Sequence, residues 1–317
     1  MNELSNPITC PVCNASAKYE FSSRDLMFDG YTRFDYFICT QCSCVSLSPM
    51  PDIETIHSFY PSDYSIYEEQ PRLKKTSSTK QALLRYSLNY AHLNPPFLFR
   101  MIAPFIALLQ KPNAPEYIEK GKLADIGCGN GRYLSNMQSL GWTVQGVELS
   151  EHGVKSCRAA NVPVHHGDLN SANFPSEEFD VVTVRHVIEH INSPHTFMQE
   201  LSRILKPGGR LIIETPSSQA LGRQLFGANW FANEVPRHIV LHSPQSLTIL
   251  ANQYGLNTVD QKLDATPKIF LNSIDYLIKN QGKPSKYIWW RRLLARIYVT
   301  LAKRYKRGDV IHMTFTK

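Results

Sequence analysis

A glycine-rich loop that joins a short apolar run to a helix-like segment constrains this chain more than any other feature. The run at 123–126 is apolar apart from Asp125, and Gly127, Gly129 and Gly131 follow it. Glycine tolerates positive φ angles and lets a ligand approach the backbone closely. In open α/β sheets, ligands bind at the carboxyl ends of strands, beside such turns. The loop therefore predicts a ligand site at a strand end.

Strand-like and helix-like segments alternate from this loop onward. We expect strands at 123–127, 143–149, 162–165, 179–184, 210–214, 256–263 and 310–316, and helices at 132–140, 154–160, 194–205 and from Ser243. We also expect a turn at 206–209 and a long loop at 215–242. Alternating β and α units predict a parallel sheet with right-handed crossovers. The expected fold is α/β, a doubly wound and mostly parallel sheet of seven strands.

Two Cys-x-x-Cys pairs lie near the N-terminus, with aromatic, strand-like sequence between them. The pairs are Cys10 with Cys13 and Cys39 with Cys42. Four thiolates suit tetrahedral zinc, and the doubled spacing is typical of zinc sites. Cys44 is an alternative to Cys42 as the fourth ligand, and a further alternative is that the cysteines only pack. A zinc ion with four protein ligands would be structural, stabilising a segment too short for a core of its own.

Composition divides the chain into three parts. We expect a zinc-ribbon module at 1–48, a linker at 49–80, and a main domain at 81–317 that begins with helices at 81–110. The main domain carries an insert at about 265–308. The net charge of +7 arises from 34 basic and 27 acidic residues, and the excess of basic residues lies in 265–317. The charge therefore does not mark the whole protein as a nucleic-acid binder.

The cysteine spacing also bears on location. Close cysteine pairs suit metal binding in a reducing compartment better than a disulfide framework. We find no signal-peptide pattern near the N-terminus, and the best apolar stretch, 97–109, is too short to span a bilayer. We therefore expect a cytoplasmic protein.

Three motifs together resemble those of class I S-adenosylmethionine-dependent methyltransferases. The run at 125–131, DIGCGNG, resembles that family's first motif, and the runs at 179–182 and 205–210 resemble its fourth-strand and fifth-strand motifs. An acid just before the glycines suits a ligand with a cationic end, whereas a pyrophosphate would favour a helix N-terminus. The resemblance covers about 121–263. It implies a Rossmann-like methyltransferase fold and S-adenosylmethionine as the cofactor.

The resemblance also implies which residues bind the cofactor, all of them at the ends of expected strands. The set is Asp125, Gly127, Cys128, Gly129, Gly131, Glu148, Asp168, Leu169 and Arg185. Within it, Asp125 would meet the methionine end, Glu148 the ribose hydroxyls, and Asp168 the adenine amino group. We interpret Cys128 as a small spacer and not as a nucleophile.

Two histidine-containing segments supply candidates for a catalytic base. Methyl transfer is an in-line displacement, so a base is needed only when the acceptor keeps its proton until late. His238 lies in the long loop expected to cover the acceptor and is the first choice, although it could instead hold the loop. His186 and His190 lie after the fourth strand, in a segment that resembles the metal-binding loop of ubiquinone-pathway O-methyltransferases. His186 replaces an acid there, which argues against a second metal, and His190 could simply cap the next helix.

The acceptor class follows from the combination of modules. A zinc ribbon before a methyltransferase domain resembles bacterial enzymes of sugar and cell-surface polysaccharide synthesis, and also ribosomal RNA guanine methyltransferases. The segment at 48–64 resembles the first group more closely, so we expect a sugar, nucleotide-sugar or glycan precursor as acceptor. A zinc-ribbon RNA methyltransferase and a non-catalytic, zinc-scaffolded interaction protein are the alternatives. Basic residues confined to one region argue against RNA.

The basic part of the insert has helical spacing. Apolar residues recur at Trp290, Leu293, Leu294, Ile297 and Leu301, with arginine and lysine between them. A basic amphipathic helix near 287–306 can lie on an anionic membrane, which would place the protein at the inner membrane surface. The interpretation that we favour from the sequence is a helix packed on the sheet or on a second subunit, whose basic face is solvated.

Overall fold

The computed structural model describes residues 8–60, 76–109, 112, 114–280 and 290–317. Residues 61–75 of the expected linker and 287–289 of the expected basic helix lie outside the described residues. The chain divides into two compact units. Unit 1 comprises Met1–Tyr64, Val184–Ser202 and Leu211–Lys317, and unit 2 comprises Ser65–Thr183 and Arg203–Arg210.

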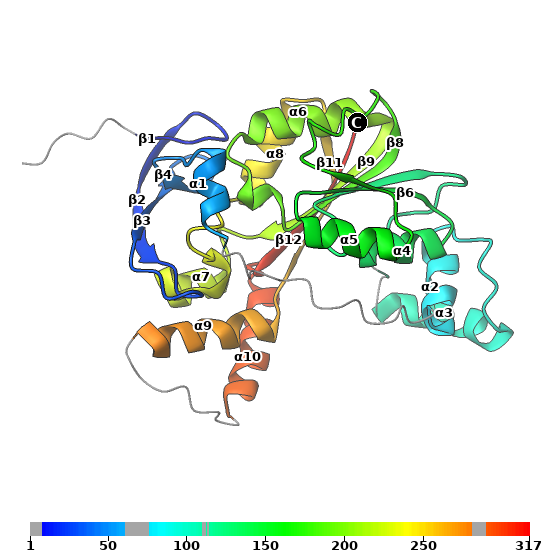
Figure 1. Ribbon diagram of the computed structural model, residues 1–317. Coiled ribbons are helices and arrows are strands. Elements are labelled where there is room, and N and C mark those ends of the chain that lie inside the picture. Colours follow the sequence, from blue (N-terminus) through cyan, green and yellow to red (C-terminus); the bar gives the residue numbers. More distant parts are fainter. Residues whose placement is uncertain (1–7, 61–75, 110–111, 113, 281–289) are drawn as a thin grey trace, which may run out of the picture. The chain divides into compact units, whose positions relative to one another are not determined.

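The larger of two sheets confirms the expected fold class. Its strands are hydrogen-bonded in the order β11-β12-β9-β8-β5-β6-β7 (Figure 1). They are β5 (Lys122–Ile126), β6 (Thr143–Glu148), β7 (Val164–His166), β8 (Phe179–Arg185), β9 (Leu205–Pro216), β11 (Asn257–Asp264) and β12 (Val310–Thr316). Strands β5, β6 and β7 are parallel, whereas β11 and β12 form an antiparallel pair. The sheet is therefore mixed, and the antiparallel strands β11 and β12 are connected through α9 and α10.

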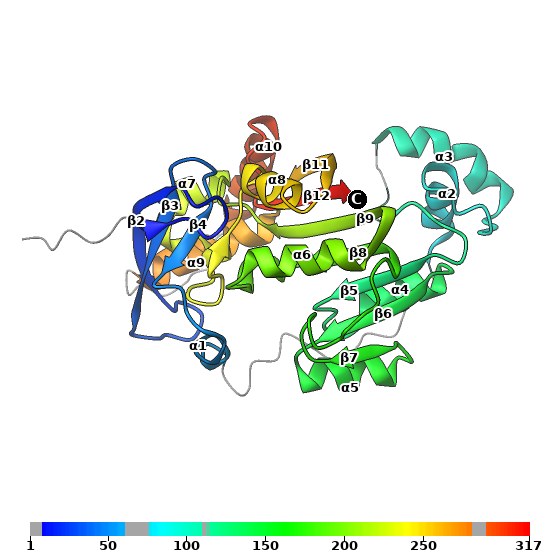
Figure 2. The same cartoon turned by 90° about the horizontal axis from the view of Figure 1, so that it is seen from above.

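Helices of unit 2 pack beside the parallel strands. Helix α4 contacts β6, and α5 contacts β6 and β7 (Figure 2). Side-chain capping explains where α5 begins, because the Ser150 hydroxyl accepts the Gly153 N–H. The helices are α2 (Ser78–Ser87), α3 (Phe97–Leu109), α4 (Arg132–Ser139) and α5 (Glu151–Ala159).

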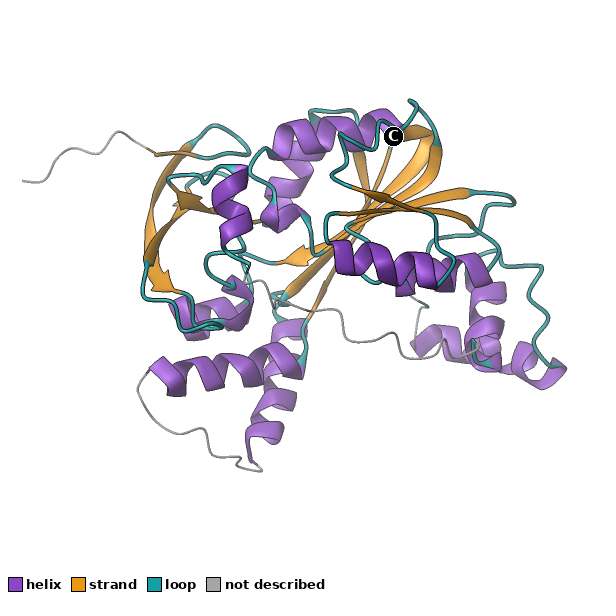
Figure 3. Cartoon of the chain, viewed as in Figure 1, coloured by secondary structure: helices purple, strands orange, loops and turns teal. Residues whose placement is uncertain are grey.

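Helix α8 of unit 1 begins where the sequence predicts, because Ser243 and Ser246 form a capping box ahead of it. Figure 3 shows α9 and α10 as a packed pair of helices beside α7. The helices outside unit 2 are α1 (Ile53–Ser58), α6 (Pro194–Ile204), α7 (Leu221–Phe226), α8 (Pro244–Asn252), α9 (Pro267–Asn280) and α10 (Trp290–Arg304). Among the described residues, no helix combines the length and the hydropathy that crossing a bilayer requires.

Two local expectations were wrong. The segment at 206–209, expected to be a turn, belongs to β9, although Gly208 does have a positive φ of 75°. The segment thus lies at the start of a strand of the larger sheet, although its Pro-Gly-Gly sequence favours a turn. The expected loop at 215–242 contains α7, two short 3₁₀ turns and strand β10 (Val240–Leu241). Its contacts with distant segments, which the local sequence does not reveal, impose this structure.

The smaller sheet combines the cysteine-containing segment with residues far along the chain. Its strands are β1 (Ile8–Thr9), β2 (Ser16–Arg24), β3 (Arg33–Cys39), β4 (Val45–Ser48) and β10, in that order. Strand β10 pairs antiparallel with β4, and the Leu47 N–H donates to the Ile239 carbonyl at 2.9 Å. The sheet formed by β1 to β4 therefore takes its last strand, β10, from far along the chain. The expected boundaries of the zinc-ribbon module stay a prediction.

Candidate functional site

The glycine loop of unit 2 has the conformation that its sequence predicts. Gly127, Gly129 and Gly131 adopt φ angles of 70°, 57° and 72°. L-residues with a Cβ rarely adopt these angles, so three glycines in alternation are required by the backbone itself. A Cβ at Gly131 would also lie only 2.8 Å from Cys157 Sγ. The loop therefore brings bare backbone to the carboxyl end of β5.

Asp125 is buried at the start of this loop. Its Oδ1 accepts a hydrogen bond from Thr183 Oγ1 at 2.6 Å, which fixes the direction of the carboxylate. A carboxylate taken out of water requires hydrogen bonds or a cationic partner. Its place fits the cationic amino-acid end of S-adenosylmethionine, because opposite charge would lower the free energy of the buried acid.

Glu148 ties the end of β6 to the glycine loop. Its Oε2 accepts the Gly129 N–H at 2.7 Å, and its Oε1 accepts the Ser150 N–H at 2.8 Å. An ionised carboxylate accepts up to about four hydrogen bonds, which makes it a suitable acceptor for ribose hydroxyls. A Cβ at Gly153 would lie 2.8 Å from Glu148 Cγ, which shows how closely the carboxylate is packed. Glu148 can thus shape the loop and bind a ribose at once.

The other expected cofactor residues differ in burial. Asp168 is exposed, and its Oδ1 accepts the Ser171 N–H at 2.7 Å, whereas Leu169 is buried. Cys128 is buried with its Sγ 3.7 Å from Cys157 Sγ, and that contact together with burial raises the pKa of Cys128. The thiol therefore stays neutral, in keeping with a spacer. Arg185, the last residue of β8, is partly buried.

The four expected zinc ligands converge in unit 1. The sulfur atoms of Cys10, Cys13, Cys39 and Cys42 all lie within 4.8 Å of one another. Cys10 and Cys42 are 3.7 Å apart, and Cys13 and Cys39 are 3.4 Å apart. A tetrahedral ion with Zn–S bonds of about 2.3 Å separates its sulfurs by about 3.8 Å. The four side chains therefore fit zinc without rearrangement of the backbone.

The backbone around both cysteine pairs repeats one geometry. Asn14 and Ser43, each just after the second cysteine of a pair, have φ angles of 59° and 58°. The Val12 N–H approaches Cys10 Sγ at 3.4 Å, and the Cys42 N–H approaches Cys39 Sγ at 3.4 Å. Such N–H groups stabilise thiolates, which are the metal-binding form of cysteine.

A cluster of histidine and acidic side chains also lies in unit 1 and contains all three expected catalytic histidines. Ligating atoms of Glu189, His190 and His238 lie within 4.8 Å of one another. His238 Nε2 is 3.9 Å from Glu189 Oε1 and 3.6 Å from Glu234 Oε2. His186 Nδ1 lies 3.4 Å from the same Glu189 oxygen. Sequence segments 186–190 and 234–238 thus meet at the buried carboxylate of Glu189.

Hydrogen bonds indicate which nitrogen of two rings carries the proton. His238 Nδ1 lies 2.8 Å from the Ala232 carbonyl, and His190 Nδ1 lies 3.0 Å from the Arg237 carbonyl. A carbonyl only accepts, so each Nδ1 is assigned as the donor. In a neutral ring, Nε2 then keeps a lone pair. His238 therefore presents a proton acceptor toward Glu189 and Glu234.

Charges within the cluster shift its proton affinities. Burial alone would raise the pKa of Glu189, but the His186 ring, 3.4 Å from Oε1, and the nearby imidazoles outweigh it and lower the pKa to about 2. Burial opposes protonation of His186, but Glu189 and Glu214 outweigh it and raise its pKa to about 10. A cationic His186 therefore already neutralises Glu189, which leaves less negative charge for a second metal ion. Burial and the neighbouring His238 lower the pKa of His190.

The cluster continues toward the edge of the larger sheet through residues that the sequence did not single out. Glu214 Oε1 lies 3.4 Å from His186 Nε2, and its Oε2 lies 3.5 Å from His312 Nδ1. His312 Nε2 lies 3.5 Å from Asp264 Oδ2. Acids and imidazoles thus alternate from Glu189 to Asp264. Glu214, His312 and Asp264 share no local motif with 186–190, so only the sheet pairing reveals them.

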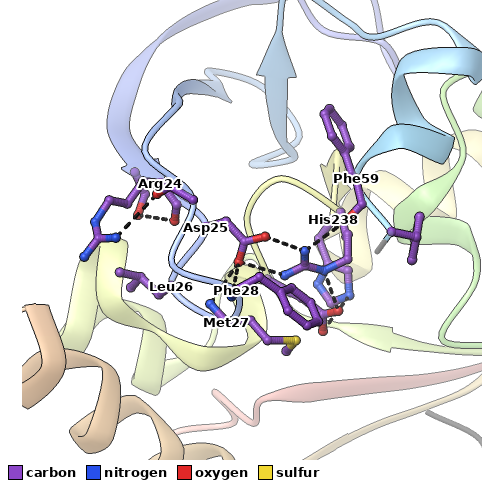
Figure 4. A network of polar contacts seen from close by, with 12 residues as sticks. Arg24, Asp25, Leu26, Met27, Phe28, Phe59 and His238 are labelled. Atoms are coloured by element: carbon purple, nitrogen blue, oxygen red, sulfur yellow. Dashed lines mark hydrogen bonds and ion pairs between the residues drawn. The ribbon is translucent and has the colours of Figure 1, made fainter. Parts of the chain in front are cut away.

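Arg237 links the cluster to the N-terminal segment. Its guanidinium is fully buried, with Nη1 2.6 Å and Nη2 3.2 Å from the two oxygens of Asp25, and Nε 3.2 Å from Glu234 Oε1. Figure 4 shows the Asp25 carboxylate within this network, with Phe28 close to it. The Phe59 carbonyl accepts a further bond from Nη1 at 3.3 Å. Arg237 therefore fixes Glu234 and, through the backbone, the adjacent His238.

Comparisons with known proteins support the interpretation of the motifs. A family model described as a methyltransferase domain matches residues 79–261, more than half of the chain. A ubiquinone biosynthesis O-methyltransferase of Maricaulis maris is 34% identical over 125 residues, which cover 37% of this chain and 49% of the relative. One of Brucella ovis is 28% identical over 162 residues, covering 47% and 65%.

The chain therefore spans about half to two thirds of the length of these curated relatives. Among solved structures, an S-adenosylmethionine-dependent methyltransferase of Archaeoglobus fulgidus aligns with a TM-score of 0.46 and 18% identity, over 69% of this chain and 92% of that one. The match of the family model decides the classification, because it includes the glycine loop and all strands from β5 to β9. This chain belongs to the methyltransferase-domain family.

Proposed function

We propose that this protein is an S-adenosylmethionine-dependent methyltransferase that acts on a small, hydroxyl-bearing acceptor. The observation that carries the proposal is the loop between β5 and α4, where three glycines of positive φ lie between the buried carboxylates of Asp125 and Glu148. S-adenosylmethionine supplies a methyl group on a sulfonium, which is an activated leaving group. The chain has to bind the donor, align the acceptor and exclude water.

We assign complementary roles to the two carboxylates. Asp125, held by Thr183, meets the cationic methionine end, and Glu148, bonded to the Gly129 N–H, accepts the ribose hydroxyls. Asp168 and Leu169 frame the adenine, and Arg185 is assigned to the same ligand from its place in the motif. These assignments follow from the resemblance to class I enzymes and are supported by the burial and the hydrogen bonds of the first two residues.

We propose His238 as the base that takes the proton of the acceptor hydroxyl. Its Nε2 keeps a lone pair in the neutral ring, and Glu189 and Glu234 are near enough to stabilise the imidazolium that forms. Glu189 Oε1 is buried and, among the described residues, makes no hydrogen bond of standard geometry. Such an oxygen requires a donor, and a hydroxyl of the acceptor other than the reacting one would provide it. In this proposal, His190 orients the side chains of the cluster, and His186 supplies positive charge to it.

The polar composition of this cluster supports a sugar-like acceptor, such as a sugar, a nucleotide-sugar or a glycan precursor. A phenolic hydroxyl is the second candidate, because the curated relatives are named as ubiquinone biosynthesis O-methyltransferases. Both acceptors need a base for a hydroxyl proton. A sugar carries several other hydroxyl groups beside the one that reacts, whereas a simple phenol carries few or none.

We further propose that Cys10, Cys13, Cys39 and Cys42 bind a structural zinc ion. All four ligand positions are then filled by protein, so the ion has no open position for chemistry. Its role would be to hold the sheet that β10 completes.

The experiment is methyl transfer from labelled S-adenosylmethionine to a panel of nucleotide-sugars, simple phenols and RNA. Transfer to sugars alone supports the main proposal, whereas transfer only to phenols replaces the acceptor class, and transfer only to RNA overturns the small-molecule assignment. Calorimetry with S-adenosylhomocysteine tests the cofactor site separately. Binding that is unchanged in both Asp125→Asn and Glu148→Gln would refute that site. His238→Gln should abolish transfer while keeping cofactor affinity.

A further inference from the structure

Helix α10 exposes its large apolar residues and buries its small ones. The exposed side chains, with their exposed fractions, are Trp290 (40%), Leu293 (53%), Leu294 (40%), Ile297 (47%) and Leu301 (39%). Positions three, four and seven apart share one face of a helix, so these five form a single stripe. Scattered exposed apolar residues are ordinary, but a continuous stripe marks an interaction surface.

Packing within unit 1 fixes which way this stripe faces. The buried face of α10 consists of Ala295, Tyr298 and Ala302, which pack with Phe270 of α9. The rings of Tyr298 and Phe270 stack with centroids 4.7 Å apart, and the Tyr298 hydroxyl donates to Asp309. Rotating the helix to bury leucine and isoleucine would break these contacts. The packing of α10 within unit 1 therefore leaves the stripe on the surface of that unit.

The remaining face of the helix is basic. Arg292, Arg296 and Lys303 lie on it and are exposed, Arg304 is exposed at the C-terminal end of the apolar stripe, and α10 contains no acidic residue. The one buried arginine of the helix, Arg291, has its own partner in Asp275 at 2.6 Å. A second copy of this chain would bring the same positive charge to the contact, which opposes a symmetric dimer through this face. Anionic headgroups complement the charge, and acyl chains complement the stripe.

We propose that α10 docks this protein on an anionic membrane surface, with its axis in the plane of the interface. Trp290, Leu293, Leu294, Ile297 and Leu301 enter the boundary between headgroups and acyl chains. The arginines and lysines beside them extend to the phosphates. The contact is peripheral and reversible, and it does not depend on which acceptor is methylated.

Flotation of the full-length protein with lipid vesicles tests the proposal. We expect binding to vesicles of phosphatidylglycerol mixed with phosphatidylcholine, weak binding to phosphatidylcholine alone, and release by high salt. Ile297→Gln with Leu301→Gln keeps helix propensity and should lower partitioning at least about tenfold. Arg292→Glu with Arg296→Glu should do the same. Lys18→Glu with Lys80→Glu, which changes the net charge equally at exposed positions elsewhere, is the matched control and should bind nearly as the parent does.

Three outcomes would overturn the proposal. The first is absence of binding to anionic vesicles by the parent protein, shown to be folded by circular dichroism. The second is equal binding by the parent and the Ile297→Gln, Leu301→Gln protein. The third is a dimer, detected by light scattering, that the same two substitutions convert to a monomer, because the stripe would then be a subunit interface. Failure of methyl transfer would not affect this test, since vesicle binding needs no cofactor.

Discussion

Replacement of Asp25 by asparagine would remove the closest negative charge from a guanidinium that has no contact with solvent. Both oxygens of Asp25 engage Arg237, at 2.6 and 3.2 Å, in a bidentate pair. Removal of one partner of a buried ion pair costs about 3–5 kcal/mol, because the other charge stays buried. Glu234 still lies 3.2 Å from Arg237 Nε. We therefore expect the lower end of that range, about 3 kcal/mol.

Urea unfolding measured by tryptophan fluorescence can report this loss, since Trp230 is buried in the same unit. A double-mutant cycle isolates the ion pair. When Arg237→Met removes the cation, Asp25→Asn should cost less than about 1 kcal/mol. Asp29→Asn is the matched control, because Asp29 and its partner Lys279 are largely exposed, and we expect a change within about 0.5 kcal/mol.

We expect a coupling energy of about 2 kcal/mol or more between Asp25 and Arg237. If Asp25→Asn cost the same in the presence and in the absence of Arg237, the buried pair would not be the source of the stability. A loss no larger than that of Asp29→Asn would mean that Glu234 alone satisfies the arginine.

Three further outcomes follow from the sites. Glu148→Gln, which loses charged hydrogen bonds to the loop, should weaken S-adenosylhomocysteine binding about 10- to 100-fold by calorimetry, with zinc content unchanged. Cys13→Ser should abolish stoichiometric zinc by atomic absorption, whereas Cys44→Ala should retain it, and equal loss would make Cys44 a ligand. His186 has a folded pKa of about 10, above its ordinary value of 6.5, so its stabilising contribution is complete below pH 6.5 and declines as the pH rises toward 10. His186→Asn, which suits the positive φ there, should thus be less stable than the parent at pH 6.5, and a gap that persists above pH 10 would contradict this pKa.

Local sequence was sufficient for the elements around the cofactor loop. The apolar run at 123–126, the glycines after it and the capping serines each act on their immediate neighbours, so spacing alone places β5, α4 and α5. The same holds for the two cysteine pairs, because each fixes its own backbone turn. These features depend on contacts a few residues apart.

Long-range pairing accounts for what the sequence did not reveal. The segment at 206–209 belongs to β9 although its Pro-Gly-Gly sequence favours a turn, and the short strand β10 pairs with β4, which lies far earlier in the sequence. Glu214, His312 and Asp264 join the histidine cluster from three different strands. No local spacing rule connects such positions.

The pairing of β4 with β10 sets the order in which this protein can be assembled. The ribosome must synthesise nearly two hundred more residues after Ser48 before Val240 emerges, about 10–40 s at ordinary elongation rates. During that interval, the edge of β4 that will pair with β10 has no neighbouring strand. An unpaired strand edge can pair with the wrong segment or with another chain. A metal ion acquired early would hold them together until their last strand arrives.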